Sequence, residues 1–297
     1  MLGKHFLSLH HFTASDLNKI ISRAATLKSE LRAGVPHPLL KGKTMAMIFQ
    51  QPSNRTRISF EVGMNQLGGF TLNIRPDEIQ LASREPIPDV ARVMSRYVDV
   101  VMMRVAKHST LTEFAAASSV PVVNGLCDKF HPCQAASDML TIQEHKGRLE
   151  GLKMCYIGDG NNVCVSLIHA CNLMGMKITV ACPKGYEPTL DGDFDYELSH
   201  TPAEAIRNSD VVYTDVWTSM GQEEESERRR QKFKGFTITK ELFEQASAEA
   251  LFMHCLPAHR GEEVTHDVVE HPRSIVFDQA ENRLHVQKAI LAGILSS

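Results

Sequence analysis

The segment Ser53-Asn54-Arg55-Thr56-Arg57 brings together two guanidinium groups and two hydroxyl groups, which are side chains that bind phosphate. It follows the apolar run Met47-Ile48-Phe49 and precedes a helical pattern, so it predicts a turn between a strand and a helix. Ser53 suits the N-cap position. Arginines in a first helical turn oppose the helix dipole, which favours anions there by roughly 0.3 to 1 kcal/mol, and a bound phosphate would remove that conflict. The alternative is a pair of solvated surface arginines.

Arg104 ends another apolar run, which begins at Val98. A buried arginine is costly unless it is paired, so this side chain indicates either a bound anion or a buried salt bridge to a carboxylate. His131 and Gln134 follow a third run, in the sequence His-Pro-Cys-Gln, where the proline suits the first position of a helix. The imidazole could donate a hydrogen bond to a carbonyl oxygen, although a histidine beside a helix cap is more often structural.

Asp215 and Cys255 each follow an apolar run in the second half of the chain. A carboxylate at a strand end could face a cationic ammonium group. A free cysteine is more often a small buried residue than a reactive one, and that interpretation of Cys255 stays open. The charged segment from Glu223 to Lys232 is interpreted as a solvated helix.

The segment Gly158-Asp159-Gly160-Asn161-Asn162 resembles the glycine-rich turn of dinucleotide-binding folds. Val163 replaces the third glycine of that fingerprint, however, and Cys182-Pro183 stands where an acidic ribose ligand is expected about 20 residues later. A nicotinamide-dependent oxidoreductase is therefore the weaker interpretation of this turn.

These residues must be positioned by strands and helices that alternate along the chain. The apolar runs that predict buried strands are residues 44–49, 98–105, 120–123, 153–157, 177–181, 211–214, 251–254 and 274–277. Helical patterns lie between most of them. Such alternation predicts parallel sheets wrapped by helices, in which ligands bind at the carboxyl ends of the strands.

The predicted fold class is therefore α/β, with two doubly wound lobes that each contain a mainly parallel sheet flanked by helices. The segment from His131 to Gly151 is predicted to be one long helix that bridges the lobes. We expect one domain over residues 1–134 and a second over residues 135–281, with a C-terminal helix over 282–297 that packs back on the first.

The composition is that of an ordinary globular protein. With 297 residues, 43% of them hydrophobic, the chain can form two cores. A net charge of −3 gives no general excess of basic residues for nucleic acid, and no apolar run is long enough to span a membrane. No signal peptide is evident, so we expect a cytoplasmic protein or one imported into an organelle. The seven cysteines include no Cys-x-x-Cys pair and predict neither a disulfide framework nor a zinc site.

The motif Ser-x-Arg-Thr-Arg at residues 53–57, followed by Ser59-Phe60-Glu61, resembles the carbamoyl phosphate motif of the aspartate/ornithine carbamoyltransferase family. The matches extend in order over nearly the whole chain. The resemblance implies that domain 1–134 binds carbamoyl phosphate and domain 135–281 binds the amine substrate. Carbamoyl phosphate would be held by Ser53, Asn54, Arg55, Thr56, Arg57, Gln80, Arg104, His131, Gln134, Cys255, Leu256 and Arg283.

Three motifs resemble the ornithine branch of this family in particular. The first is Gly158-Asp159-Gly160-Asn161-Asn162, in which the residue matching Asn162 binds the amino-acid end of the substrate. The others are Asp215-x-x-x-Ser219-Met220-Gly221, which aspartate enzymes lack, and His254-Cys255-Leu256-Pro257, where aspartate enzymes carry leucine in place of the cysteine. The resemblance implies transfer of a carbamoyl group to the δ-amine of L-ornithine, giving L-citrulline and phosphate, a step of arginine biosynthesis. The implied catalytic residues are Arg104, His131, Asp215 and Cys255, and the implied ornithine ligands are Asn162, Asp215, Ser219 and Met220.

The resemblance also implies a homotrimer, because Gln80 matches a residue that reaches the carbamoyl phosphate of a neighbouring subunit. No cofactor and no metal are expected, since arginines can neutralise the leaving phosphate. Other acceptors remain open, namely putrescine, aspartate and an N-acylated ornithine. A two-lobed solute-binding protein without catalysis is the remaining alternative.

Overall fold

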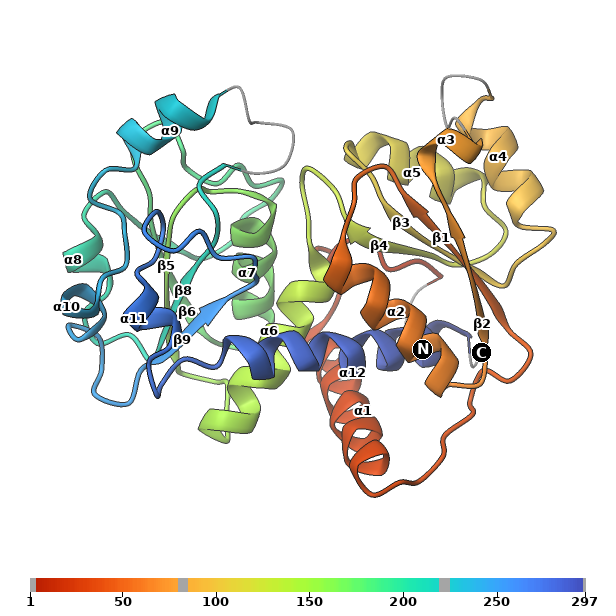
Figure 1. Ribbon diagram of the computed structural model, residues 1–297, viewed down its shortest axis with the longest axis horizontal. Coiled ribbons are helices and arrows are strands. Elements are labelled where there is room, and N and C mark those ends of the chain that lie inside the picture. The colour runs from red at the N-terminus through yellow and green to blue at the C-terminus, as the bar shows by residue number, and fades with distance from the viewer. Residues whose placement is uncertain (1–3, 80–84, 219–224, 296–297) are drawn as a thin grey trace. The chain divides into compact units, whose positions relative to one another are not determined.

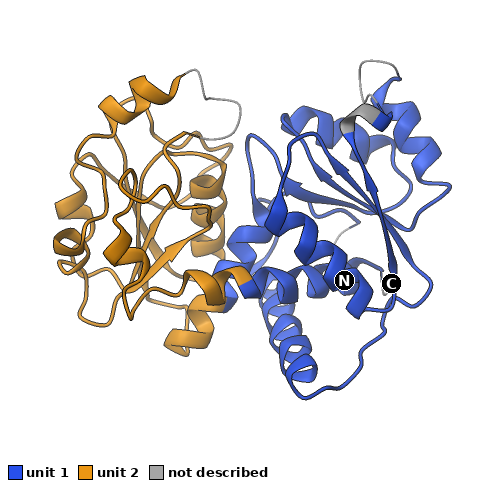
Figure 2. Cartoon of the chain, in the orientation of Figure 1, with its two compact units in different colours: residues 1–140, 281–297 blue, residues 141–280 orange. Residues whose placement is uncertain are grey.

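The structure is a computed structural model, and it describes residues 4–79, 85–218 and 225–295. The chain forms two compact units, one over residues 1–140 and 281–297 and the other over residues 141–280 (Figure 2). It passes from unit 1 to unit 2 within α6 (Pro132–Lys146) and returns within α12 (Val276–Leu295). The predicted limits at residues 134–135 and 281–282 fall in the same two helices.

Unit 1 contains a four-stranded parallel sheet in the order β2-β1-β3-β4. Its strands are β1 (Thr44–Phe49), β2 (Phe70–Ile74), β3 (Val100–Arg104) and β4 (Val122–Leu126). Its other helices are α1 (Ala14–Arg32), α2 (Asn54–Gln66), α3 (Pro76–Ile79), α4 (Ile87–Met94) and α5 (His108–Ala117). Helices α4 and α5 cover one face of this sheet and α2 covers the other (Figure 1), as right-handed crossovers require.

Unit 2 contains a five-stranded parallel sheet in the order β7-β6-β5-β8-β9. Its strands are β5 (Lys153–Ile157), β6 (Lys177–Ala181), β7 (Glu197–Ser199), β8 (Val211–Thr214) and β9 (Leu251–His254). Its remaining helices are α7 (Asn162–Leu173), α8 (Pro202–Ala205), α9 (Ser226–Lys232), α10 (Lys240–Phe243) and α11 (His266–Val269). Helix α7 lies on one face of the sheet and α8 and α10 lie on the other (Figure 1).

The fold class predicted from the sequence is confirmed, because both sheets are parallel and flanked by helices. The inner strands are buried on both faces, which is why continuous apolar runs marked them so clearly. The runs at 44–49, 153–157, 177–181, 211–214 and 251–254 are strands with those bounds. The edge strands β2 and β7 were not predicted, because their side chains are mostly exposed and leave no apolar run.

One predicted strand, over residues 274–277, is wrong. Ser274 forms only an isolated bridge with Phe252, and α12 begins at Val276, six residues before the predicted start of the C-terminal helix. A short apolar run cannot be distinguished by periodicity from the first turn of a buried helix. The predicted bridging helix is also shorter than expected, since it ends at Lys146 before Gly147, whose φ is +72°.

Within the part of the chain that the structure describes, no helix is both long enough and apolar enough to cross a membrane.

Candidate active site

The predicted functional residues form two groups, one in each unit. In each group the side chains follow the carboxyl ends of neighbouring parallel strands, which meet at the same edge of a sheet. The group in unit 1 comes from the ends of β1, β3 and β4 and from α12. The group in unit 2 comes from the ends of β5, β8 and β9.

The first turn of α2 forms as the sequence predicts. Ser53 is the N-cap with an extended backbone, and its Oγ accepts a hydrogen bond from the amide of Thr56 at 3.3 Å. Asn54 and Arg57 are exposed, and the Arg57 side chain pairs loosely with Glu61 at 3.4 Å. The amides and guanidinium groups of this turn are therefore gathered at the positive end of a helix dipole, which suits an anionic ligand.

Arg283 joins three elements of unit 1 in one buried cluster. Its Nη1 donates to Oε1 of Gln134 at 2.7 Å, and its Nη2 donates to Oγ1 of Thr56 at 3.3 Å. Gln134 in turn donates through Nε2 to Asp138 at 2.8 Å. All four side chains are buried. The structure thus brings together predicted residues from α2, α6 and α12 that are up to 227 positions apart in the sequence.

His131 lies close enough to Arg283 of this cluster, and to Arg104 and Arg55, to be influenced by their charges. Burial holds the pKa of its imidazole well below the usual value, and the positive charges of Arg283, Arg104 and Arg55 lower the pKa further. The ring is therefore neutral near pH 7 and can donate one hydrogen bond without adding charge. Three guanidinium groups act on the same buried ring, so this edge of the sheet has a strongly positive potential that suits a phosphate dianion.

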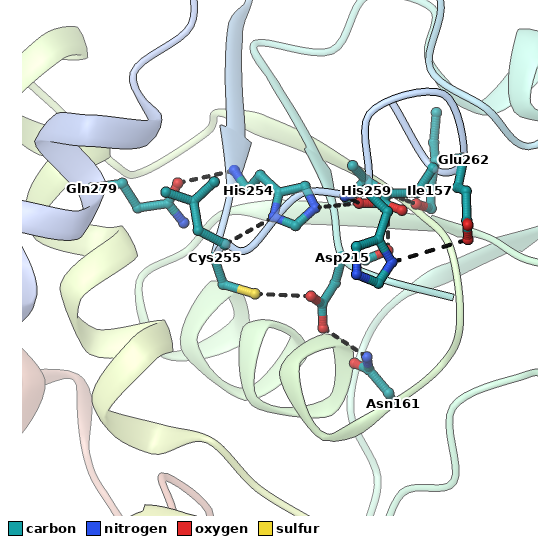
Figure 3. Close-up of polar contacts among 11 residues, drawn as sticks. Ile157, Asn161, Asp215, His254, Cys255, His259, Glu262 and Gln279 are labelled. Carbon is teal, nitrogen blue, oxygen red and sulfur yellow. Dashed lines mark hydrogen bonds and ion pairs between the residues drawn. The ribbon is translucent and has the colours of Figure 1, made fainter. Parts of the chain in front are cut away.

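The group in unit 2 is centred on Asp215, at the end of β8. Its Oδ1 accepts a hydrogen bond from Sγ of Cys255 at 2.9 Å, and its Oδ2 accepts one from Nδ2 of Asn161 at 2.8 Å (Figure 3). The carboxylate is buried, whereas the cysteine is half-buried. The thiol and the carboxylate therefore lie side by side, with the carboxylate oriented from both sides.

Asn161 has a second function as the N-cap of α7. Its Oδ1 accepts hydrogen bonds from the amides of Val163 and Cys164 at 3.0 and 3.1 Å, which leaves Nδ2 free to orient Asp215. Asn162 was predicted from the sequence as a ligand, whereas Asn161 was not. The missed signal is an asparagine directly before a helix, which is a typical N-cap. Asn162 itself is half-buried in the first turn of α7.

The turn that follows β9 is held by three residues that sequence reasoning also missed or left without a function. His254 accepts the amide hydrogen of Leu256 at Nδ1, at 2.8 Å, and contacts Glu263 through Nε2 at 3.0 Å. The amide of His254 donates to Gln279 at 2.9 Å (Figure 3). Leu256 has a φ of +59°, so these bonds hold an unfavourable backbone conformation that presents Cys255 to Asp215.

Asp159 and Arg229 form a buried ion pair near the same strand ends. Nη1 of Arg229 lies 2.7 Å from Oδ2 of Asp159 and also donates to the carbonyl oxygen of Trp217 at 2.9 Å. The pair joins the turn after β5 to the segment after β8. Nothing in the sequence indicated which of the many charges in α9 would turn inward.

Three predicted residues, Gln80, Ser219 and Met220, lie outside the described residues.

Two clusters in unit 2 have donor atoms close enough together for a metal ion. They are Asp215 with His254 and Cys255, and His259 with Glu262 and Glu263, each within 4.8 Å. Hydrogen bonds already engage Asp215, His254 and one oxygen of Glu263.

Taken together, the two units define an α/β protein with a cluster of basic side chains at one strand edge in unit 1 and a carboxylate–thiol pair in unit 2. Comparison with known families gives two matches. Residues 4–144 match the carbamoyl-P binding domain of aspartate/ornithine carbamoyltransferases, and residues 150–294 match the Asp/Orn binding domain of the same enzymes. The chain belongs to the aspartate/ornithine carbamoyltransferase family, as its motifs predicted.

Individual relatives cover the whole chain. An ornithine carbamoyltransferase of Thermococcus kodakarensis is 51% identical over 99% of this chain and 97% of that protein. An anabolic ornithine carbamoyltransferase of Pyrococcus furiosus is 49% identical, again over 99% of this chain and 97% of that protein. Among solved structures, ornithine carbamoyltransferase from Pyrococcus furiosus matches with a TM-score of 0.95 at 48% identity, covering 99% of this chain and 98% of that one. The enzyme from Thermus thermophilus matches with a TM-score of 0.91 at 41% identity, covering 99% and 100%.

Proposed function

We propose that this protein is an enzyme that transfers the carbamoyl group of carbamoyl phosphate to the δ-amine of L-ornithine, giving L-citrulline and phosphate. The observation that supports it most directly is the pairing of Asp215 with Cys255, in a chain whose relatives at about half identity are named ornithine carbamoyltransferase. The anabolic name of one relative favours the direction of arginine biosynthesis.

Unit 1 is the proposed site for carbamoyl phosphate. The phosphate is assigned to the first turn of α2, with Ser53, Asn54, Arg55, Thr56 and Arg57, and to Arg104. The carbamoyl end is assigned to His131, Gln134 and Arg283, with Cys255 and Leu256 of unit 2 and Gln80 of a neighbouring subunit as further contacts. The guanidinium groups neutralise the phosphate as it leaves, and neutral His131 donates a hydrogen bond to the carbonyl oxygen on which negative charge develops.

Unit 2 is the proposed site for ornithine, bound by Asn162, Asp215, Ser219 and Met220. The δ-nitrogen attacks the carbonyl carbon with its lone pair, and the bond between that carbon and the phosphate oxygen then breaks. A primary amine has a pKa near ~10, so the attacking amine must lose a proton before or during attack. Asp215, oriented by Asn161 and Cys255, is assigned to accept a hydrogen bond from that amine and to take its proton as the nitrogen attacks.

A homotrimer in the cytoplasm is the proposed assembly and location. Unit 1 exposes the large apolar side chains of Ile58 and Val62 on α2 and of Phe70 and Leu72 on the edge strand β2. Apolar surface on an unpaired sheet edge suits contact with another copy of the chain. Neither nucleic acid nor membrane is a proposed partner.

An assay with four acceptors tests the proposed function. Carbamoyl phosphate is supplied with ornithine, aspartate, putrescine or N-acetylornithine, and the carbamoylated product and phosphate are measured. We expect citrulline to form with the highest kcat/KM. A higher value with any other amine overturns the choice of ornithine. Binding of carbamoyl phosphate without turnover on any amine overturns the enzyme and supports a solute-binding protein.

A further inference from the structure

Lys288 is a fully buried cation that the proposed function does not use. It lies on α12, five residues after Arg283, and its side chain has no exposed surface. Its Nζ donates to Oε1 of Gln66 at 2.8 Å and lies 3.1 Å from Nε2 of His37. Both contacts are with neutral acceptors, one of them at the last residue of α2.

Burying a lysine in this way is costly, because neutral acceptors replace only part of the lost hydration of an ammonium group. The carboxylate that acts on Lys288 is that of Glu30, and it does not touch the ammonium group directly. His37 lies between them, with its Nδ1 3.3 Å from Oε2 of Glu30. An apolar residue would fill the same space at lower cost. The presence of a lysine at this buried position therefore indicates that its contact with α2 is needed.

Helix α12 contacts both ends of α2. Arg283 bonds Thr56 in the first turn, and Lys288 bonds Gln66 at the last residue, ten residues further on and about 15 Å along a helix axis. Between them the helices approach closely at Gly63, where an added Cβ would lie 3.2 Å from Cγ of Lys288 and 3.5 Å from Cδ1 of Leu284. Figure 1 shows the two helices side by side within unit 1. With both ends fixed, α2 can neither slide along α12 nor rotate about its own axis.

The first turn of α2 needs such a fixed position. It carries Arg55 and Arg57 at a helix N-terminus, where their charges repel the helix dipole in the absence of an anion. Phosphate recognition depends on several donors in a fixed arrangement, and displacements of about 1 Å are enough to weaken it. We propose that Lys288 is a positioning residue for the carbamoyl phosphate site, which holds the far end of α2 so that its first turn stays in register with Arg283. This proposal rests on the proposed binding of carbamoyl phosphate in unit 1.

Lys288→Met tests the proposal, because it keeps the apolar stem beside Gly63 and removes the ammonium group. We expect the KM for carbamoyl phosphate to rise by about threefold to tenfold, as is typical for loss of one coupled contact. The kcat and the KM for ornithine at saturating carbamoyl phosphate should stay within about twofold. The dissociation constant of carbamoyl phosphate, measured by calorimetry, should rise by the same factor as its KM.

Lys28→Met is the matched control. Lys28 is also a buried lysine that donates to α12, through Asn282 at 2.8 Å, but it belongs to α1 and its contact with α12 does not involve α2. We expect the control to lower thermal stability and to leave the affinity for carbamoyl phosphate unchanged. If the two variants weaken binding equally, or if neither weakens it, Lys288 is only a structural residue.

Gln66→Met keeps the test decisive if Lys288→Met does not fold. Gln66 is partly exposed, and methionine is as good a helix former as glutamine, so the helix itself is not weakened. The variant should raise the KM for carbamoyl phosphate in the same direction, and the double variant should be no worse than the poorer single variant. Additive effects overturn the proposal. Failure of the wild-type protein to bind carbamoyl phosphate would instead refute the proposed function, so the two failures are distinguishable.

Discussion

The imidazole of His131 is held in its neutral form by its surroundings. Its pKa is lowered first by burial and then by Arg283, Arg104 and Arg55. A protonated imidazole would repel the same arginines and would compete with them for the phosphate. A neutral ring can instead act as a hydrogen-bond donor near pH 7. The proposed function of His131 is therefore to orient and polarise the carbonyl group without transferring a proton.

The neutral form of His131 predicts that its imidazole does not titrate in the usual range of a histidine. In spectra of the protein with labelled histidine, we expect the His131 resonances to stay constant between pH 5.5 and 8. The variant Arg283→Met should raise the pKa of His131, since it removes one of the charges that lower it. Because the folded pKa lies below the unfolded value of about 6.5, stability should fall as the pH is lowered below 6.5, where only the unfolded chain takes up this proton. A normal His131 titration near pH 6.5 would contradict the proposed donor function.

At the scale of single residues, motifs selected several side chains that the structure brings together, and they did not select the side chains that hold the surrounding turns. Ser53, Thr56, Gln134 and Arg283 were selected from the sequence and lie in one cluster. Gln279 and Glu263 were not, because their partners are backbone amides and side chains that only the folded chain brings near. Asn161 was overlooked although an asparagine directly before a helix is a local N-cap signal. The turns that these residues stabilise have no periodic signal in the sequence.

The turn after β5 shows how closely neighbouring elements can approach. A Cβ added to Gly160 would lie 2.3 Å from the backbone nitrogen of Pro188 and 2.5 Å from the carbonyl carbon of Glu187. Glycine is therefore required here by space, and it also donates a backbone hydrogen bond to Tyr186 at 2.9 Å. The next residue is Asn161, which orients Asp215.

Gly160→Ala should therefore affect both stability and the ornithine site. We expect a loss of about 1 to 3 kcal/mol in the free energy of unfolding, because the clash is with backbone atoms. The KM for ornithine should rise and that for carbamoyl phosphate should stay constant. Gly147→Ala is the comparison: its φ is +72° with open space around the Cβ position, so it should cost about 1 kcal/mol and change neither KM. Equal KM values for ornithine in wild type and Gly160→Ala would refute the link between this turn and the amine site.

At the scale of elements, the sequence predicts the strands that are buried on both faces of a sheet. The inner strands are continuous apolar runs, so their bounds were found closely, whereas β2 and β7 are exposed edges whose pairing depends on a neighbour. The beginning of α12 was assigned to a strand for a related reason, since four apolar or small residues fit either conformation. A local sequence pattern predicts which strands are buried, but it does not predict which strand pairs with which.

At the scale of the whole molecule, the exposed apolar side chains of α2 and β2 form a surface that is solvent-exposed in a single copy of the chain. Phe70 is 66% exposed on the edge strand, next to Leu72 on the same strand. In the proposed homotrimer this surface would be covered by another subunit. The same surface belongs to the helix that carries the proposed phosphate site, so assembly and substrate binding would depend on a common element.

Phe70→Glu tests this dependence. We expect analytical ultracentrifugation to show a shift from trimer towards monomer, because the contact would bury a charge, and the affinity for carbamoyl phosphate should fall with it. Phe277→Glu makes the same change at a phenylalanine that is also 66% exposed but lies in the first turn of α12 in unit 2. This control should leave the sedimentation unchanged. Identical behaviour of the two variants would place the interface elsewhere.

The course of the chain through the two units has a consequence for synthesis on the ribosome. Unit 1 begins the chain, but Arg283 and Lys288 are supplied by α12, after all of unit 2 has been made. A nascent chain that already contains the Ser53–Arg57 turn thus still lacks the residues that bond Thr56 and Gln66 from α12. If carbamoyl phosphate binds as proposed, its site is complete only after the last helix has docked, so we expect an unfinished polypeptide not to capture carbamoyl phosphate.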